Sequence, residues 1–218
     1  MKKAVGCCCL ITFLLIFANV SFAGEWPQGR WGIGPRISLY YMNDYDLADD
    51  TEINTSASAL FEGNVTWYAR KWFSLEFSGG YVKTNADVPY LGQNPDIGEF
   101  QQIPILLTAR FHLWHPHDWF NLYGGGGVGY YFNDFDVSDD LSGITPPLDY
   151  SLSLDNSFGA HLAVGFEGFV TKNWCINGDL KYIWNEADYS ESVPGFFSPR
   201  ESIDLDALVF GIGFKYYF

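Results

Sequence analysis

Eight stretches of the chain alternate apolar and polar residues with a period of two, which constrains the fold more than any other feature. In the last stretch, Phe214, Tyr216 and Phe218 alternate with Gly213 and Lys215. Side chains two residues apart share one face of a β-strand, so one face of this segment is wholly aromatic. Aromatic residues line the membrane interfaces of outer-membrane barrels. The pattern predicts a membrane-facing strand; the alternative is an edge strand of a soluble β-sandwich.

Seven further segments show the same alternation, each with an apolar face and a face that is polar or rich in glycine. Their apolar faces run over residues 31–41, 57–67, 73–81, 103–111, 120–132, 158–166 and 174–184. The connections are short at 70–71, 115–118 and 171–173, and long near 43–54, 84–99, 133–155 and 186–202. Outer-membrane barrels have short periplasmic turns and longer extracellular loops, whereas a soluble lipocalin-like barrel carries its apolar face inward. The pattern predicts an all-β fold, an eight-stranded antiparallel up-and-down transmembrane β-barrel with both termini in the periplasm.

The first 23 residues have the composition of a cleaved secretory signal peptide. A basic start is followed by an apolar stretch over 4–17, and Ser21-Phe22-Ala23 forms a small-x-small cleavage site. Cleavage leaves a single barrel domain, residues 24–218. Of the four cysteines only Cys175 remains, so we expect no intramolecular disulfide. No other stretch has the roughly 18 apolar residues that a membrane-spanning helix needs.

The acidic residues lie mostly in the long connections. The formal net charge is −14, with 26 acidic residues against 12 Lys and Arg. A protein with this excess of negative charge repels nucleic acid, which we therefore exclude as a partner. Carboxylate oxygens could hold divalent cations, but no stretch has the ligand spacing of a dedicated calcium loop, so we expect solvated loops.

Charged residues of both signs lie on the faces predicted to point into the barrel. They are Arg36, Glu62, Glu76, Arg110, Glu167, Asp179, Lys181 and Lys215. Counted from the periplasmic ends, Arg36 and Glu62 fall at similar depth on neighbouring strands, as do Glu76 and Arg110. An eight-stranded barrel has room only for side chains or one small ligand, and a charge buried there must be paired or wetted. We predict an inward ion-pair network, densest towards the periplasm, which disfavours an open aqueous pore.

Two histidine patterns raise the question of catalysis and metal binding. A lipid-modifying barrel enzyme needs a nucleophile and a base within hydrogen-bond reach. Ser157 and His161 share a strand face but lie four residues apart, about 13 Å by strand rise, so we expect His161 to hydrogen-bond in the lumen. His112, His115 and His117 could bind zinc, but His112 points inward while the others are expected on a turn. We predict no enzyme activity, no cofactor and no metal site.

Short motifs in consistent order give the chain a resemblance to a known family. They are Arg30-Trp31-Gly32, Ile103-Pro104, Tyr123-Gly124-Gly125-Gly126, Ser151-Leu152-Ser153-Leu154, Ser157-Phe158-Gly159-Ala160, Val164-Gly165, Lys172-Asn173-Trp174, Asn177, Tyr182, Ser202-Ile203-Asp204-Leu205-Asp206 and Val209-Phe210 with the final Phe218. The chain resembles the outer membrane protein W family of small eight-stranded barrels. It departs from the family at Ala207, where a proline is usual, and in its richly charged lumen.

The resemblance implies passive movement of small hydrophobic molecules across the outer membrane of a Gram-negative bacterium, without energy source or cofactor. A charge-paired lower lumen would favour entry from outside and sideways exit into the bilayer. The ending with Gly213, Tyr216 and Phe218 also resembles the insertion signal that the barrel-assembly machinery reads. Expected partners are therefore this machinery, outer-membrane lipid, lipopolysaccharide and small hydrophobic solutes. The alternative is a structural or adhesive barrel with a charge-plugged lumen. The apolar loop patch 193–197 fits either reading, as an entrance or as an adhesive tip. An apolar cavity in the upper lumen, open to the outside, would favour transport.

Overall fold

The computed structural model describes most of the predicted barrel domain. The described residues are 27–42, 45–47, 51–55, 57–87, 96–117, 119–137, 151–192 and 201–218. The expected signal peptide, 1–23, and the loop patch 193–197 lie outside these ranges. Within them, no helix is both long and apolar enough to cross a membrane.

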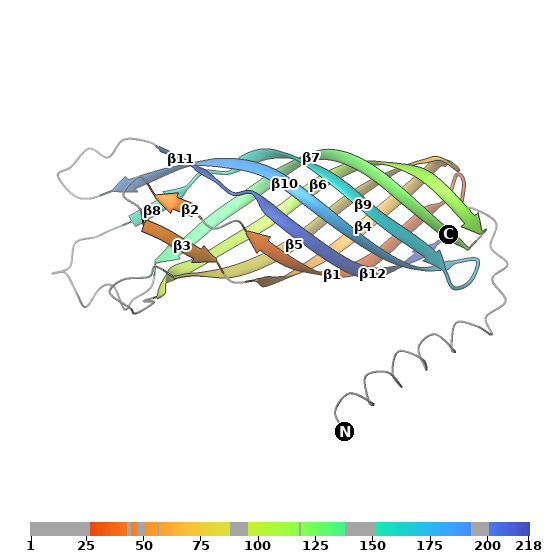
Figure 1. Cartoon of the computed structure of the whole chain (residues 1–218), viewed down its shortest axis with the longest axis horizontal. Helices are drawn as coiled ribbons and strands as arrows, with labels where there is room; N and C mark the ends of the chain where they lie inside the picture. The colour runs from red at the N-terminus through yellow and green to blue at the C-terminus, as the bar shows by residue number, and fades with distance from the viewer. Residues whose placement is uncertain are drawn as a thin grey trace, which may run out of the picture.

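Eight long antiparallel strands form a closed barrel (Figure 1). They are β1 (Trp31–Met42), β4 (Ser58–Arg70), β5 (Phe73–Asp87), β6 (Asp96–His117), β7 (Phe120–Val137), β9 (Ser157–Phe169), β10 (Trp174–Ser192) and β12 (Ala207–Tyr217). Each strand pairs with the next, and β12 returns to pair with β1, so the predicted eight-stranded barrel is confirmed. Below, "turn end" means the end where short connections join β4 to β5, β6 to β7 and β9 to β10, and "loop end" means the opposite end.

The start of β1 and the C-terminal residue after β12 meet at the turn end and complete the ring. The Trp31 backbone N–H donates to the Phe218 carbonyl oxygen at 3.4 Å, and the Phe218 N–H donates to the Trp31 oxygen at 2.9 Å. The Arg30 side chain adds a bond of 2.6 Å to the carbonyl oxygen of Tyr217. The final strand therefore leaves no free sheet edge. A free edge would expose unpaired backbone groups to the membrane, where no water is present to satisfy them.

The alternation of burial along the strands confirms the two faces predicted from the sequence. Large apolar side chains on the outer face are between 36% and 78% exposed. Aromatic members near the turn end include Trp31, Trp67, Trp72, Trp174 and Tyr216, and those near the loop end include Tyr41, Tyr81, Phe132, Phe158 and Trp184. An apolar outer face with aromatic bands near both ends is the surface that an outer-membrane barrel presents to lipid.

Several strands extend beyond the predicted boundaries, so parts of the expected long connections were wrongly assigned. β5 continues to Asp87, β7 to Val137 and β10 to Ser192, while β6 already begins at Asp96 and runs to His117. The extensions contain many polar residues, which hide the period of two, but backbone pairing between neighbouring strands continues regardless. Four short strands also pair at the loop end: β2 (Tyr45–Leu47), β3 (Thr51–Thr55), β8 (Ser151–Leu154) and β11 (Glu201–Asp204).

The ladder between β5 and β6 is interrupted at a proline. Register pairs run to Gly79 and Ile105 and resume at Val82 and Gln102, so the stretch opposite Pro104 is unpaired. Proline has no backbone N–H to donate to a ladder. We call this interruption the β5–β6 gap.

Candidate functional site in the barrel lumen

The inward face of β10 shows how the lumen changes character from the turn end to the loop end. Cys175 is followed by the charged Asp179 and Lys181, then by Ile183 and finally by Asn185, and all five are buried. Side chains from the other strands complete a layer at each of these levels. The lumen is therefore a stack of layers that differ in polarity.

The eight charged residues predicted for the lumen all lie inside it, and we call them the ion cluster. Their side chains are at most 1% exposed, and each takes part in at least one ion pair. Four positive and four negative charges give the cluster no formal net charge. The seven strands other than β7 contribute them, and Tyr123 of β7 completes the circle because the Arg110 guanidinium lies 4.5 Å from the centre of its ring.

Glu76 is the hub of the ion cluster. Its carboxylate accepts from Arg36 at 3.1 Å, from Lys215 at 2.7 Å and from Arg110, and the Thr66 hydroxyl donates to it at 2.9 Å. Charge-assisted hydrogen bonds of this kind are the strongest that side chains form. The hub on β5 is thereby connected to four other strands, β1, β4, β6 and β12.

Asp179 and Glu62 form a second centre on the loop side. Arg36 Nη1 lies 3.0 Å from Asp179 Oδ2, and Lys181 Nζ lies 3.2 Å from Glu62 Oε1 and 3.5 Å from Asp179 Oδ1. The predicted neighbours Arg36 and Glu62 approach only to 4.0 Å. The shortest ion-pair contacts of Arg36 therefore reach past the adjacent strands to β10 and β5.

An aromatic layer, the floor, closes the lumen at the turn end. Tyr68, Phe169, Cys175 and Tyr217 are each at most 3% exposed and pack as one cluster. The hydroxyls of Tyr68 and Tyr217 both donate to Glu167, the latter at 3.1 Å, which joins the floor to the ion cluster. Sequence reasoning did not identify Tyr68, although an aromatic residue on a polar strand face is a recognisable signal.

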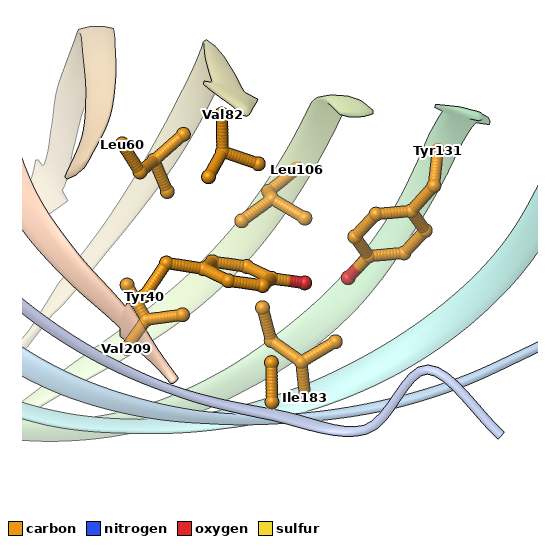
Figure 2. Close-up of a cluster of buried hydrophobic side chains, with 8 residues drawn as sticks. Tyr40, Leu60, Val82, Leu106, Tyr131, Ile183 and Val209 are labelled. Atoms are coloured by element: carbon orange, nitrogen blue, oxygen red, sulfur yellow. The ribbon is translucent and has the colours of Figure 1, made fainter. Parts of the chain in front are cut away.

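On the loop side of the ion cluster, apolar side chains meet across the lumen (Figure 2). This apolar ring consists of Tyr40, Leu60, Val82, Leu106, Tyr131, Ile183, Ala207 and Val209, which are at most 2% exposed. β1 and β7 are four strands apart in either direction around the ring, so Tyr40 and Tyr131 come from opposite walls, and their hydroxyls point towards one another. Side chains therefore close the upper lumen, and the open apolar cavity that would have favoured transport is not seen among the described residues.

The two tyrosines of the apolar ring are held differently. The Tyr40 hydroxyl donates to Gln102 at 3.0 Å, and Gln102 donates to Asn133 at 2.9 Å. The Tyr131 hydroxyl has no hydrogen-bond partner among the described residues. Its ring lies where a Cβ on Gly129 or Gly159 would come within 2.9 Å of it. Tyr131 is thus a closing side chain that packing alone holds in place, and the sequence analysis did not single it out.

Buried amides form the next layer, which we call the amide girdle: Gln102, Asn133 and Asn185. Asn133 donates from its side chain to the Ser157 hydroxyl at 3.0 Å. Beyond the girdle, Phe100, Ala187 and Leu205 form a second apolar cluster at the loop end. From the ion cluster towards the loop end, the lumen therefore contains an apolar layer, a polar layer and a second apolar layer.

The histidines and Ser157 considered for catalysis or metal binding do not form such a site among the described residues. His161 Nε2 lies 2.9 Å from the Thr108 hydroxyl, whereas Ser157 is bonded to Asn133, so the two do not form a nucleophile–base pair. His112 is buried and lies 2.8 Å from Ser74, while the side chains of His115 and His117 lie outside the described residues. Within the described part of the chain, no cluster of His, Cys, Asp and Glu could hold a metal ion.

The residues of the predicted insertion signal lie on or against the barrel wall. The Tyr216 and Phe218 side chains are on the outer face, 39% and 65% exposed. Gly213 packs against β1, where an added Cβ would lie 2.5 Å from the carbonyl oxygen of Pro35. The pair of aromatic residues is accessible from the lipid side, and the glycine allows β12 to approach β1.

Comparisons with known proteins agree with this architecture. The family described as outer membrane protein beta-barrel domain matches residues 9–218. Outer membrane protein W of Vibrio cholerae is 28% identical over 182 residues, covering 83% of this chain and 79% of that protein. The uncharacterized outer-membrane protein y4mB of Sinorhizobium fredii is 30% identical over 169 residues, 76% of this chain and 69% of that protein. The crystal structure of OprG from Pseudomonas aeruginosa superimposes with a TM-score of 0.76 at 19% identity, covering 91% of this chain and 99% of that one.

Proposed function

The chain belongs to the outer-membrane β-barrel family, with outer membrane protein W among its relatives, and we propose that it is a passive uptake channel for small hydrophobic molecules. The observation that carries the proposal is an apolar ring placed directly above a lumen filled with paired charges. An apolar solute gains by entering the ring, because transfer from water is favourable by about 25 cal/mol per Å² of apolar surface. It gains nothing by going further, because the ion cluster offers only paired charges.

The proposed route enters at the loop end and leaves through the wall. The gap between β5 and β6 lies beside the apolar ring, since Pro104 is the register partner of Tyr131 on β7. On the lipid-facing side, Pro35, Gly63 and Gly79 are register neighbours that line a hollow of about 590 Å³. Gly79 is also the last paired residue before the gap. The unpaired stretch reduces the hydrogen bonding that is lost when β5 and β6 separate. A second interruption of this kind lies at Gly34 and Pro35 of β1, opposite β12, and borders the same hollow.

The proposal includes an orientation and partners. Both termini lie in the periplasm, because the short connections are at their end of the barrel and outer-membrane barrels place short turns there. The outer aromatic bands contact lipid, and the acidic long connections face lipopolysaccharide. The barrel-assembly machinery recognises the C-terminal strand, whose aromatic face is exposed. This role requires no catalysis.

A disulfide across the gap tests the route. In a Cys175→Ala background, Gly79→Cys with Ile105→Cys places two cysteines on register partners at the edge of the gap. Directly opposed residues of an antiparallel ladder have the Cα separation that a disulfide spans. We expect oxidation to abolish uptake of a fluorescent hydrophobic probe by cells and reduction to restore it. The matched control is Leu162→Cys with Tyr182→Cys, which are register partners in the continuous ladder between β9 and β10. Equal uptake in the oxidised and reduced forms of the gap pair would contradict sideways exit through the β5–β6 gap.

A structural barrel is the second candidate, and the closed packing of the apolar ring favours it. In that role the side chains of the ring form a core and never part. Uptake by cells that produce the protein would then equal uptake by cells that lack it. Such a result would overturn the transport proposal and leave the structural role.

A further inference from the structure

One amide of the girdle differs from the other two. Gln102 bonds to Tyr40 and Asn133, and Asn133 bonds to Ser157, so both have side-chain partners. The Nδ2 and Oδ1 atoms of Asn185 are buried and have no hydrogen-bond partner among the described residues. The residue as a whole is only 4% exposed. An amide donor and an amide acceptor are thus withdrawn from water without replacement, which costs free energy unless something binds there.

The backbone of Asn185 holds this side chain in position. Its N–H donates to Asp206 Oδ1 at 3.0 Å, and its carbonyl oxygen accepts from the Leu205 N–H at 2.6 Å. On β10 the inward residues on either side are Ile183, in the apolar ring, and Ala187, in the cluster at the loop end. A free donor and acceptor are therefore fixed between two apolar layers.

A second unpartnered group lies beside Asn185. A Cβ on Gly159 would come within 2.9 Å of Tyr131 Cε2 and 3.3 Å of Asn185 Cβ, so the two side chains flank the same stretch of bare backbone. The Tyr131 hydroxyl also has no partner among the described residues. The unpartnered Asn185 amide therefore lies beside Tyr131, the closing side chain, whose hydroxyl is also unpartnered among the described residues.

We propose that Asn185 is a specificity-determining residue that binds the hydroxyl group of a small uncharged alcohol whose apolar body occupies the apolar ring. The inference rests on the proposed uptake function and names its substrate class. A hydroxyl donates one hydrogen bond and accepts another, so it pairs with Oδ1 and Nδ2 together. A hydrocarbon leaves both atoms unpaired, and a carboxylate would lose its hydration without finding a free positive charge. Recognition by otherwise unpaired polar groups discriminates strongly against an analogue that lacks the matching group.

The experiment compares 1-hexanol with hexane in the full mature barrel refolded in lipid nanodiscs, at equal concentration in the lipid phase. NMR shifts of the Ile183 methyl groups report entry of either solute into the apolar ring, and shifts of the Asn185 side-chain amide report hydroxyl binding. We expect saturable Ile183 shifts with both solutes, Asn185 amide shifts with hexanol alone, and about five- to tenfold tighter binding of hexanol. Asn185→Leu should remove the preference and keep hexane binding.

A matched control is Asn64→Leu. Asn64 is 2% exposed and its two polar side-chain atoms also lack partners among the described residues, but it lies between Glu62 and Thr66 at the level of the ion cluster. Hexanol preference should survive this change. Equal affinity for hexanol and hexane, or a preference that persists in Asn185→Leu, would overturn the alcohol site and leave hydrocarbon uptake intact. Unshifted Ile183 methyl groups with both solutes would instead overturn the uptake function and the site with it. If Asn185→Leu fails to fold, absence of amide shifts in the unsubstituted protein is sufficient to refute the proposal.

Discussion

Replacing Glu76 by Gln tests whether the ion cluster is a connected unit that holds the barrel together. The change keeps the side chain's size but removes the negative charge that Arg36, Arg110 and Lys215 share. The cluster then carries one uncompensated positive charge in a space where every side chain is at most 1% exposed. Leaving a buried charge without its partner costs about 3–5 kcal/mol.

The three cations keep other contacts after Glu76→Gln. The loss in unfolding free energy is therefore that of one unpartnered charge and not of three. Arg36 still lies 3.0 Å from Asp179, and Lys215 still lies 3.0 Å from Glu167. The carboxylates left to Arg110, those of Glu167 and Asp179, are 3.7 Å away, and its contact with the Tyr123 ring remains. We therefore expect a total loss of about 3–5 kcal/mol, most of it from Arg110.

Urea unfolding of the refolded barrel, followed by tryptophan fluorescence, measures this loss. The control is Glu99→Gln, which removes the carboxylate of the pair with Lys83 at 2.5 Å, where both side chains are more than 40% exposed. An exposed pair contributes about 0–1 kcal/mol. The double variant Glu76→Gln with Lys215→Met restores formal neutrality and should recover part of the loss. A loss within about 1 kcal/mol of the control, with no recovery in the double variant, would refute the reasoning.

Three further predictions concern Tyr131 as the gate of the proposed route, the buried Cys175, and the contact between Phe218 and Trp31 that closes the barrel. Tyr131→Ala should raise uptake of a hydrocarbon probe several-fold, while Tyr131→Phe should leave it unchanged because the hydroxyl has no partner among the described residues; equal rates in all three proteins would contradict the gate. Maleimide should label Cys175, which is 1% exposed, at least about 100-fold more slowly in the folded barrel than in urea, and comparable rates would show that the floor is open. Deleting Phe218 removes two backbone bonds to Trp31 and should lower the folded fraction on unheated gels more than Phe218→Ala, which keeps them; the reverse order would assign the role to the side chain.

The sequence predicts which residues enter the lumen better than it predicts which of them touch. The period of two assigns Arg36 and Glu62 to the inner face, and counting from the strand ends puts them at one depth. Counting sees only neighbouring strands, however, and in a narrow barrel long side chains reach across. Arg36 therefore approaches Asp179 to 3.0 Å and its neighbour Glu62 only to 4.0 Å.

The same geometry explains why Tyr131 escaped notice. Its inward position follows from alternation, but its meeting with Tyr40 depends on two strands that are four places apart in the ring. The glycines that make room for its ring, Gly129 and Gly159, are ordinary small residues until β7 and β9 are paired. The sequence did not predict the full length of the strands for another reason. Backbone pairing continues through polar residues, where apolar and polar side chains no longer alternate.

The relative cost of the two exits supports a sideways route. An axial path has to separate the ion cluster and the floor, where breaking even one buried pair costs about 3–5 kcal/mol and Glu76 alone joins three cations. A sideways path has to move Tyr131, which has no hydrogen bond to lose among the described residues, and to part strands where Pro104 has already interrupted the ladder. An apolar solute replaces the contacts that Tyr131 gives up, so the net cost of that movement is small. If the proposed uptake function holds, we therefore expect the ion cluster to direct an apolar solute towards the membrane, because the axial path costs more.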